Sequence, residues 1–87
     1  MSLELVLFST DHCTLCDEAL DMLLSMPELA GCSVRVIDVA EDAELLDSLG
    51  ERIPILEVRG RGTVANCVRL EWPFDSEDVV GSIRQIE

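Results

Sequence analysis

The sequence predicts a single α/β domain in which helices flank a mixed sheet, in the order β-α-β-α-β-β-α. Three observations predict it: short apolar runs typical of buried strands, amphipathic segments at helical spacing between them, and turn residues at the junctions. The 87 residues, 48% of them hydrophobic, suffice for one core. No repeat, low-complexity tract or linker interrupts the chain, so we predict one domain over residues 1–87.

The first predicted strand leads directly into the first predicted helix. Residues 3–8 form a nearly continuous apolar run, as expected of a strand buried on both faces. From Cys16 onward apolar residues recur at helical spacing until Pro27, which we expect to end the helix. Thr14 and Asp17 are spaced as a capping box, which would place the helix start beside Cys16.

Two further elements follow in the middle of the chain. Residues 34–39 have the composition of a second strand. Asp42 has the side chain of an N-cap for a short helix, and Gly50 is placed to close that helix.

The last third of the chain predicts a hairpin and a final helix. Residues 55–58 and 67–70 are the two strands, joined by a turn at Gly60-Arg61-Gly62. The acidic segment 75–78 is typical of a helix start and precedes an amphipathic helix. Because strands and helices alternate, we expect helices on both faces of the sheet.

The charge balance restricts the partners. Eighteen acidic residues face six basic ones, all arginine, which gives a net charge of −12. A chain this acidic repels nucleic acid and anionic membranes, so we expect neither as a partner. The simpler explanation of the negative net charge is a solvated surface that keeps the protein soluble. The alternative is that the acidic surface binds a basic protein partner.

No targeting or membrane segment is evident, so we expect a cytoplasmic location. The first residues lack the basic and apolar regions of a signal peptide, and no run approaches the roughly 20 apolar residues of a membrane span. Structural disulfides are rare in that compartment, so a C-x-x-C motif there favours redox or metal chemistry.

Cys13-Thr14-Leu15-Cys16 is such a motif, at the junction of the first strand and helix. Two cysteines at this spacing can close a disulfide, and a helix start favours the thiolate of the outer one. A zinc site would also need Cys32 and Cys67, with His12 as a further donor. Both cysteines occur singly near strands, where cysteine usually acts as a small hydrophobe, so we expect no metal site.

This arrangement, followed by Ile53-Pro54 before a strand hairpin, resembles the thioredoxin fold. Within it the chain is most similar to the glutaredoxin branch and to small bacterial glutaredoxin-like proteins; residues 72–75 before the last helix also match. The resemblance implies a cis Pro54 that faces the dithiol and packs near Cys13. It also implies that the Ile53 backbone pairs with a bound peptide or glutathione. The alternative is a proline that merely starts a strand.

The resemblance implies a thiol–disulfide oxidoreductase. Cys13 would attack a disulfide of a protein or small molecule, and Cys16 would resolve the mixed disulfide. No bound cofactor is expected. Asp11, Asp17 and Glu18 oppose the thiolate and offset much of the helix contribution, so we expect a site suited to reduction rather than to strong oxidation.

Several departures from glutaredoxins concern glutathione. Thr14-Leu15 replaces the usual Pro-Tyr pair, and no lysine precedes the motif. The usual Gly-Gly before the last helix is replaced by residues 72–75, although the helix start at Asp75-Ser76 offers N–H groups to a carboxylate. Arg52 is available to a substrate carboxylate or to a nearby acid. Glutathione is therefore a candidate co-substrate that the local acidity disfavours.

Two alternatives remain open from the sequence. Trp72 and Phe74 are expected to cover the edge of the core, with a substrate platform as the other reading. The whole chain could also be a binding or redox-sensing module with little turnover, whose acidic surface docks a partner while the cysteines change state.

Overall fold

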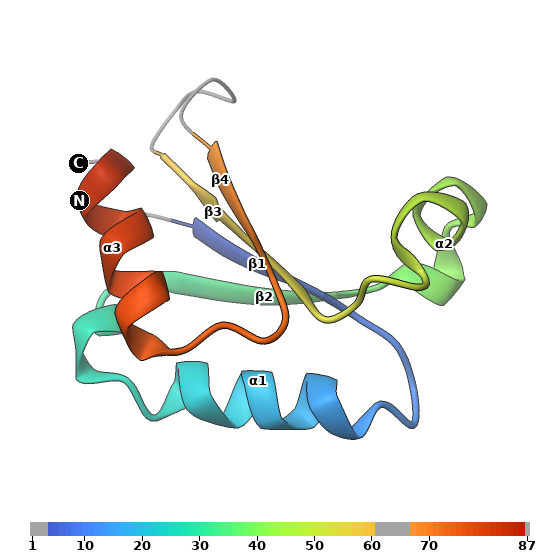
Figure 1. Ribbon diagram of the computed structural model, residues 1–87, viewed down its shortest axis with the longest axis horizontal. Helices are drawn as coiled ribbons and strands as arrows, with labels where there is room; N and C mark the ends of the chain where they lie inside the picture. Colours follow the sequence, from blue (N-terminus) through green and yellow to red (C-terminus); the bar gives the residue numbers. More distant parts are fainter. Residues whose placement is uncertain (1–3, 61–66, 87) are drawn as a thin grey trace.

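The computed structural model describes residues 4–60 and 67–86. In these ranges the order is the predicted β-α-β-α-β-β-α, with two additional short 3₁₀ turns (Figure 1). The strands and α-helices are β1 (Glu4–Ser9), α1 (Thr14–Leu24), β2 (Ser33–Asp38), α2 (Ala43–Leu49), β3 (Ile55–Arg59), β4 (Cys67–Glu71) and α3 (Ser76–Ile86). No helix of the described part is long and apolar enough to cross a membrane.

The strands form one mixed sheet in the order β2-β1-β3-β4. β1 pairs parallel with β2 and antiparallel with β3, and β3 pairs antiparallel with β4. In this register Phe8 lies opposite Ile55, which lies opposite Glu71. The chain therefore leaves β1, enters β3 and leaves β4 at the same end of the sheet.

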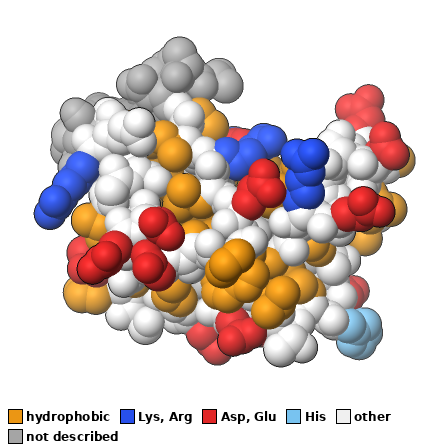
Figure 2. Space-filling view, viewed as in Figure 1, with side chains coloured by type: hydrophobic (Ala, Val, Ile, Leu, Met, Phe, Trp, Pro, Cys, Tyr) orange, Lys and Arg blue, Asp and Glu red, His pale blue; other side chains and the backbone are white. Residues whose placement is uncertain are grey.

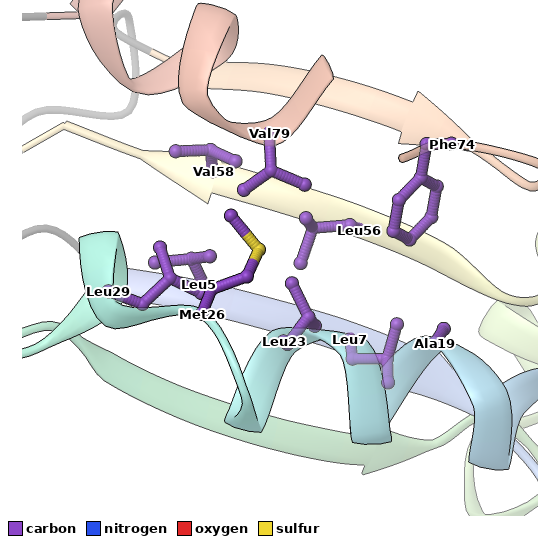
Figure 3. Packing of buried hydrophobic residues seen from close by; sticks show 10 residues of the cluster. All are labelled: Leu5, Leu7, Ala19, Leu23, Met26, Leu29, Leu56, Val58, Phe74 and Val79. Atoms are coloured by element: carbon purple, nitrogen blue, oxygen red, sulfur yellow. The ribbon is translucent and has the colours of Figure 1, made fainter. Parts of the chain in front are cut away.

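One sheet face packs against α1 and α3. Side chains from both helices and from the two central strands point toward one another in a common apolar layer (Figure 3). Its buried members are Leu5, Leu7, Ala19, Leu23, Met26, Leu29, Leu56, Val58, Phe74 and Val79. Burying each large aliphatic side chain is worth about 1.5–3 kcal/mol, so this layer is the main source of stability.

The opposite face is covered at one end by α2, so helices lie on both faces as predicted (Figure 1). A smaller core joins Val6, Phe8 and Ile55 of the sheet to Val39 and Leu49. Because these residues lie toward the end where β1 terminates, α2 leaves the rest of this face without a helical cover.

The start of α1 differs from the predicted capping box. Cys13 itself is the N-cap, its sulfur accepting a hydrogen bond from the Cys16 N–H, and Thr14 is the first helical residue. The physical reason is that the Asp17 N–H, which a Thr14 cap would have served, already donates to the Cys13 carbonyl at 3.1 Å. At the other end α1 stops at Leu24, and Pro27 begins a 3₁₀ turn instead of terminating the helix directly.

The caps of α2 follow the sequence more closely. Asp42 Oδ1 accepts hydrogen bonds from the N–H groups of Glu44 and Leu45, which confirms it as the N-cap. Gly50 closes the helix with a right-handed φ of −55°, so the helix ends there without the left-handed turn common at glycine. The predicted turn at residues 60–62 lies, beyond Gly60, outside the described residues.

Candidate functional site

Three loops meet at the end of the sheet where β1 and β4 finish and β3 begins. They are residues 10–13 before α1, Ile53-Pro54 before β3, and residues 72–75 after β4. The Trp72 N–H donates a 3.2 Å hydrogen bond to the Pro54 carbonyl, which joins two of the loops. The Ile53–Pro54 peptide bond is cis, as is Trp72–Pro73.

Cys13 and Cys16 form a disulfide at the start of α1, with 5.2 Å between their Cα atoms. Their surroundings differ: Cys13 is partly exposed, whereas Cys16 is only 2% exposed. The Cys16 N–H donates to the Cys13 sulfur at 3.2 Å. Cys13 therefore reaches solvent and its sulfur receives an N–H donor, while Cys16 is shielded from solvent.

His12, directly before the dithiol, has a left-handed backbone with φ of 58°. Its side chain is exposed, so the conformation is imposed by the chain path and not by packing of the imidazole. The left-handed residue turns the chain from the sheet into the helix, with Cys13 at the corner. The sequence gives no signal for this, because histidine is not a residue that demands positive φ.

Apolar side chains lie on the surface near the start of α1. Leu15, between the two cysteines, is 46% exposed, and orange side chains gather between the end of β4 and the N-terminal half of α1 in Figure 2. Trp72 meets Phe74 edge-on, with ring centroids 5.1 Å apart and an interplanar angle of 82°. Phe74 is buried in the core and Trp72 packs against it partly buried, which confirms that both cover the edge of the core.

The predicted substrate residues are distributed around the same end. Pro54 is buried, Ile53 is partly buried beside the α2 core, and Arg52 is exposed. Within the described residues Arg52 makes no ion pair, so the alternative of pairing with a nearby acid is not seen.

The start of α3, proposed from the sequence as a carboxylate site, carries its own carboxylates. Asp75 Oδ1 accepts from the Asp78 N–H at 2.9 Å, and Asp78 Oδ2 accepts from the Asp75 N–H at 3.1 Å. In this reciprocal cap the Asp75 N–H is already used. The N–H groups of Ser76 and Glu77 lie beside the two aspartate charges, which disfavours a bound carboxylate. The sequence contains a signal for this cap: Asp78 follows Asp75 by three residues, which is the spacing of a capping box.

The remaining cysteines lie away from the dithiol. Cys32 is partly buried against the main core, as predicted, but Cys67 is exposed, so its expected burial was wrong. The reason is its place on the uncovered sheet face at the far end of edge strand β4, opposite Arg59. Across the described residues no three histidine, cysteine or acidic side chains gather as a metal site would require.

The uncovered sheet face carries a chain of ion pairs. Buried Glu57 accepts from Arg59 Nε at 2.6 Å and from Arg69 Nη2 at 2.8 Å. Arg59 also approaches Glu4 at 3.6 Å, and Glu4 approaches Arg35 at 3.8 Å, so the chain crosses all four strands. These pairs allow a carboxylate to occupy a sheet position that would otherwise be apolar.

Two pKa values are shifted by this cluster. Burial acts to raise the pKa of Glu57, but hydrogen bonds from Arg69 and Arg59 and their charges outweigh it and hold that pKa below its ordinary value. Partial burial and the Glu57 charge raise the pKa of the Cys67 thiol. The raised pKa lowers the fraction of Cys67 thiolate, although the residue is exposed.

Comparison with known proteins identifies the family. The family model described as Glutaredoxin-like domain (DUF836) matches residues 4–84. The chain belongs to this glutaredoxin-like family. A search of curated proteins finds no match.

Solved structures agree with this assignment of the glutaredoxin-like domain. The X-ray structure of target protein XcR50 from X. campestris is similar with a TM-score of 0.71 and 26% identity, covering 92% of this chain and 95% of that one. A structure described as a malarial protein has a TM-score of 0.72 at 12% identity, covering 98% and 97%; it shows the fold alone. The fold is therefore thioredoxin-like, as the sequence predicts.

Proposed function

We propose that this glutaredoxin-like domain is a thiol–disulfide oxidoreductase in which Cys13 is the nucleophile and Cys16 the resolving cysteine. The observation that carries the proposal is the asymmetry of the pair: a partly exposed Cys13 linked to a Cys16 that is 2% exposed. An incoming disulfide reaches the first sulfur and not the second, which is the division of roles that two-step exchange needs.

The reduced pair would act in two steps. The Cys13 thiolate attacks one sulfur of a substrate disulfide, forming a mixed disulfide and releasing the first substrate thiolate. Cys16, deprotonated, then attacks the Cys13 sulfur, closing the protein disulfide and releasing the second substrate thiolate. Two electrons pass from the protein dithiol to the substrate, and an external thiol must reduce the Cys13–Cys16 disulfide for another turnover.

The Cys16 N–H supports this division. It donates to the Cys13 sulfur at 3.2 Å, and the same donor would stabilise the Cys13 thiolate before it attacks the substrate. The positive end of α1 adds to this, by about 0.3–1 kcal/mol for a surface charge. Both contributions act on Cys13, whose sulfur caps the helix.

Substrate docking is proposed at the loops that surround Cys13. Ile53 and Pro54 border the dithiol end of the sheet, and Arg52 is an exposed cation beside them. Glutathione is a weaker candidate co-substrate than a protein or neutral small disulfide. Its carboxylates would meet the Asp75 and Asp78 side chains at the helix start proposed to hold them.

The test is reduction of insulin and of hydroxyethyl disulfide with dithiothreitol as the electron source. The native chain should accelerate both reactions, and Cys13→Ser should reduce the rates to background. Cys32→Ser is the matched control, because it removes a thiol outside the proposed site, and it should retain the native rate. Equal rates for native chain and Cys13→Ser would overturn the enzyme proposal, and a single stoichiometric oxidation would favour the redox-sensing alternative.

A further inference from the structure

We infer that the dithiol selects cationic disulfides over anionic ones, and that the Asp17 carboxylate is a main determinant of this preference. The inference rests on the proposed exchange function and specifies its substrate class. The favoured substrate is a disulfide flanked by lysine or arginine in a basic protein, or a small diamine disulfide.

The position of Asp17 relative to Cys13 carries the inference. The Asp17 N–H donates to the Cys13 carbonyl at 3.1 Å, so the two residues are stacked one helical turn apart. Cys13 is the N-cap of α1 and Asp17 lies in the first turn, so both residues are at the N-terminal end of this helix. Cys13 is partly exposed and Asp17 is exposed, so a substrate bonded to the Cys13 sulfur meets the helix end that carries this carboxylate.

The neighbouring charges have the same sign. Glu18 follows on the exposed surface of α1, and Asp11 is exposed two residues before Cys13. Within the described residues these three acids make no ion pair. Their charge is therefore available to a substrate.

Three arginines of the described residues are paired away from this end. Arg35, Arg59 and Arg69 are held by Glu4 and Glu57 on the uncovered sheet face. In Figure 2 blue side chains lie next to red ones between β4 and α2, away from the lower edge where α1 runs. Of the described arginines, Arg52 lies at the dithiol end; His12, next to Cys13, is counted as neutral.

The positive charge of Arg52 is offset by acidic residues at the same end of the sheet. Glu51 precedes it in the chain, and Glu71 ends β4 opposite Ile55 at that edge of the sheet. The balance of charge around Cys13 is thus negative. An anionic substrate is repelled at the point of attack, and a cationic one is attracted.

The experiment compares disulfides of opposite charge. Single-turnover oxidation of the reduced chain is followed with cystamine, hydroxyethyl disulfide and dithiodipropionate, which carry positive, zero and negative charge. Each rate constant is divided by that of 2-mercaptoethanol with the same disulfide, which removes differences in the leaving thiols. We define the selectivity as the normalised rate constant for cystamine divided by that for dithiodipropionate. Both rate constants contain the same fraction of Cys13 thiolate, so this fraction cancels in the ratio.

Two variants with equal change in net charge locate the effect. Asp17→Asn should lower the selectivity about threefold at low salt, and Glu28→Gln, beyond the far end of α1, should leave it unchanged. Added salt near 0.5 M should reduce the selectivity of the native chain in the same direction. A selectivity near one in the native chain, or equal losses in both variants, would overturn the inference. Failure to oxidise the dithiol with the neutral disulfide would instead overturn the proposed function.

Discussion

The backbone N–H of Cys16 points at the sulfur of Cys13 from 3.2 Å. This contact replaces the side-chain cap predicted from Thr14, so the residue proposed to attack also closes the first turn of its helix. The helix start and the reactive sulfur are thus positioned by the same interaction. Changes that move Cys13 are expected to affect local stability together with chemistry.

His12→Val should destabilise the loop before Cys13. The φ of 58° at this position is disfavoured for a β-branched side chain, and we expect the free energy of unfolding to fall by about 1–2 kcal/mol. Urea unfolding of the oxidised chain measures it. Asp11→Val, at the exposed neighbouring position, is the control and should change stability much less; equal losses would argue against backbone strain.

Trp72→Ala should weaken the edge of the core beside Pro54. The partly buried indole packs edge-on against Phe74, and its loss should cost about 1–3 kcal/mol. Unfolding followed by circular dichroism, which does not depend on tryptophan fluorescence, measures the change. Trp72→Phe keeps an aromatic edge and should recover most of the loss; no recovery would mean that ring contact is not the cause.

Glu57→Gln should make stability less dependent on pH. Because the pKa of Glu57 is lowered in the fold, its contribution is present above the ordinary carboxyl pKa of 4.5 and is lost as the pH falls through the folded value. At pH 7 the variant should be about 1–3 kcal/mol less stable, since two arginines lose a charged partner. Urea unfolding between pH 7 and pH 3 should show the difference shrinking toward acid; a constant difference would contradict the ion-pair explanation.

Cys67 should react slowly with iodoacetamide at pH 7.5 despite its exposure. Its pKa is raised by partial burial and by the Glu57 carboxylate, which lowers the fraction of thiolate. Replacing Glu57 by glutamine leaves Arg59 and Arg69 beside the thiol and should accelerate its alkylation several-fold. Peptide mapping in the native state gives the rate, and Cys32 in the same molecule serves as the reference; parallel acceleration of both would indicate unfolding instead.

The order of elements was predictable because the hydrophobic periodicity alone separates the strands from the helices. The buried run of β1 and the Asp42 cap illustrate this. Both signals come from neighbouring residues in the chain, so contacts distant in sequence do not change the predicted elements. The resemblance then identified the Cys13-x-x-Cys16 and Ile53-Pro54 pair, which the register places at one end of the sheet.

The details that failed depend on contacts distant in sequence. The burial of Glu57 was not predicted, because it depends on Arg69, twelve residues away on the neighbouring strand. Cys67 was expected inside because cysteine is usually buried, but α2 stops short of its part of the sheet. Thr14 was predicted as the N-cap because threonine is common at this position. The known N-cap preferences do not include a cysteine sulfur as the acceptor.

Trapping the mixed disulfide tests the central claim most directly. The Cys16→Ser variant is mixed with excess hydroxyethyl disulfide, and intact mass and peptide mapping locate the adduct. The account predicts rapid addition of one mercaptoethanol group at Cys13, with Cys13→Ser showing no adduct at Cys16 on the same time scale. An adduct that forms first at Cys32 or Cys67, or equally fast at Cys16 in Cys13→Ser, would contradict the assignment of Cys13 as the nucleophile.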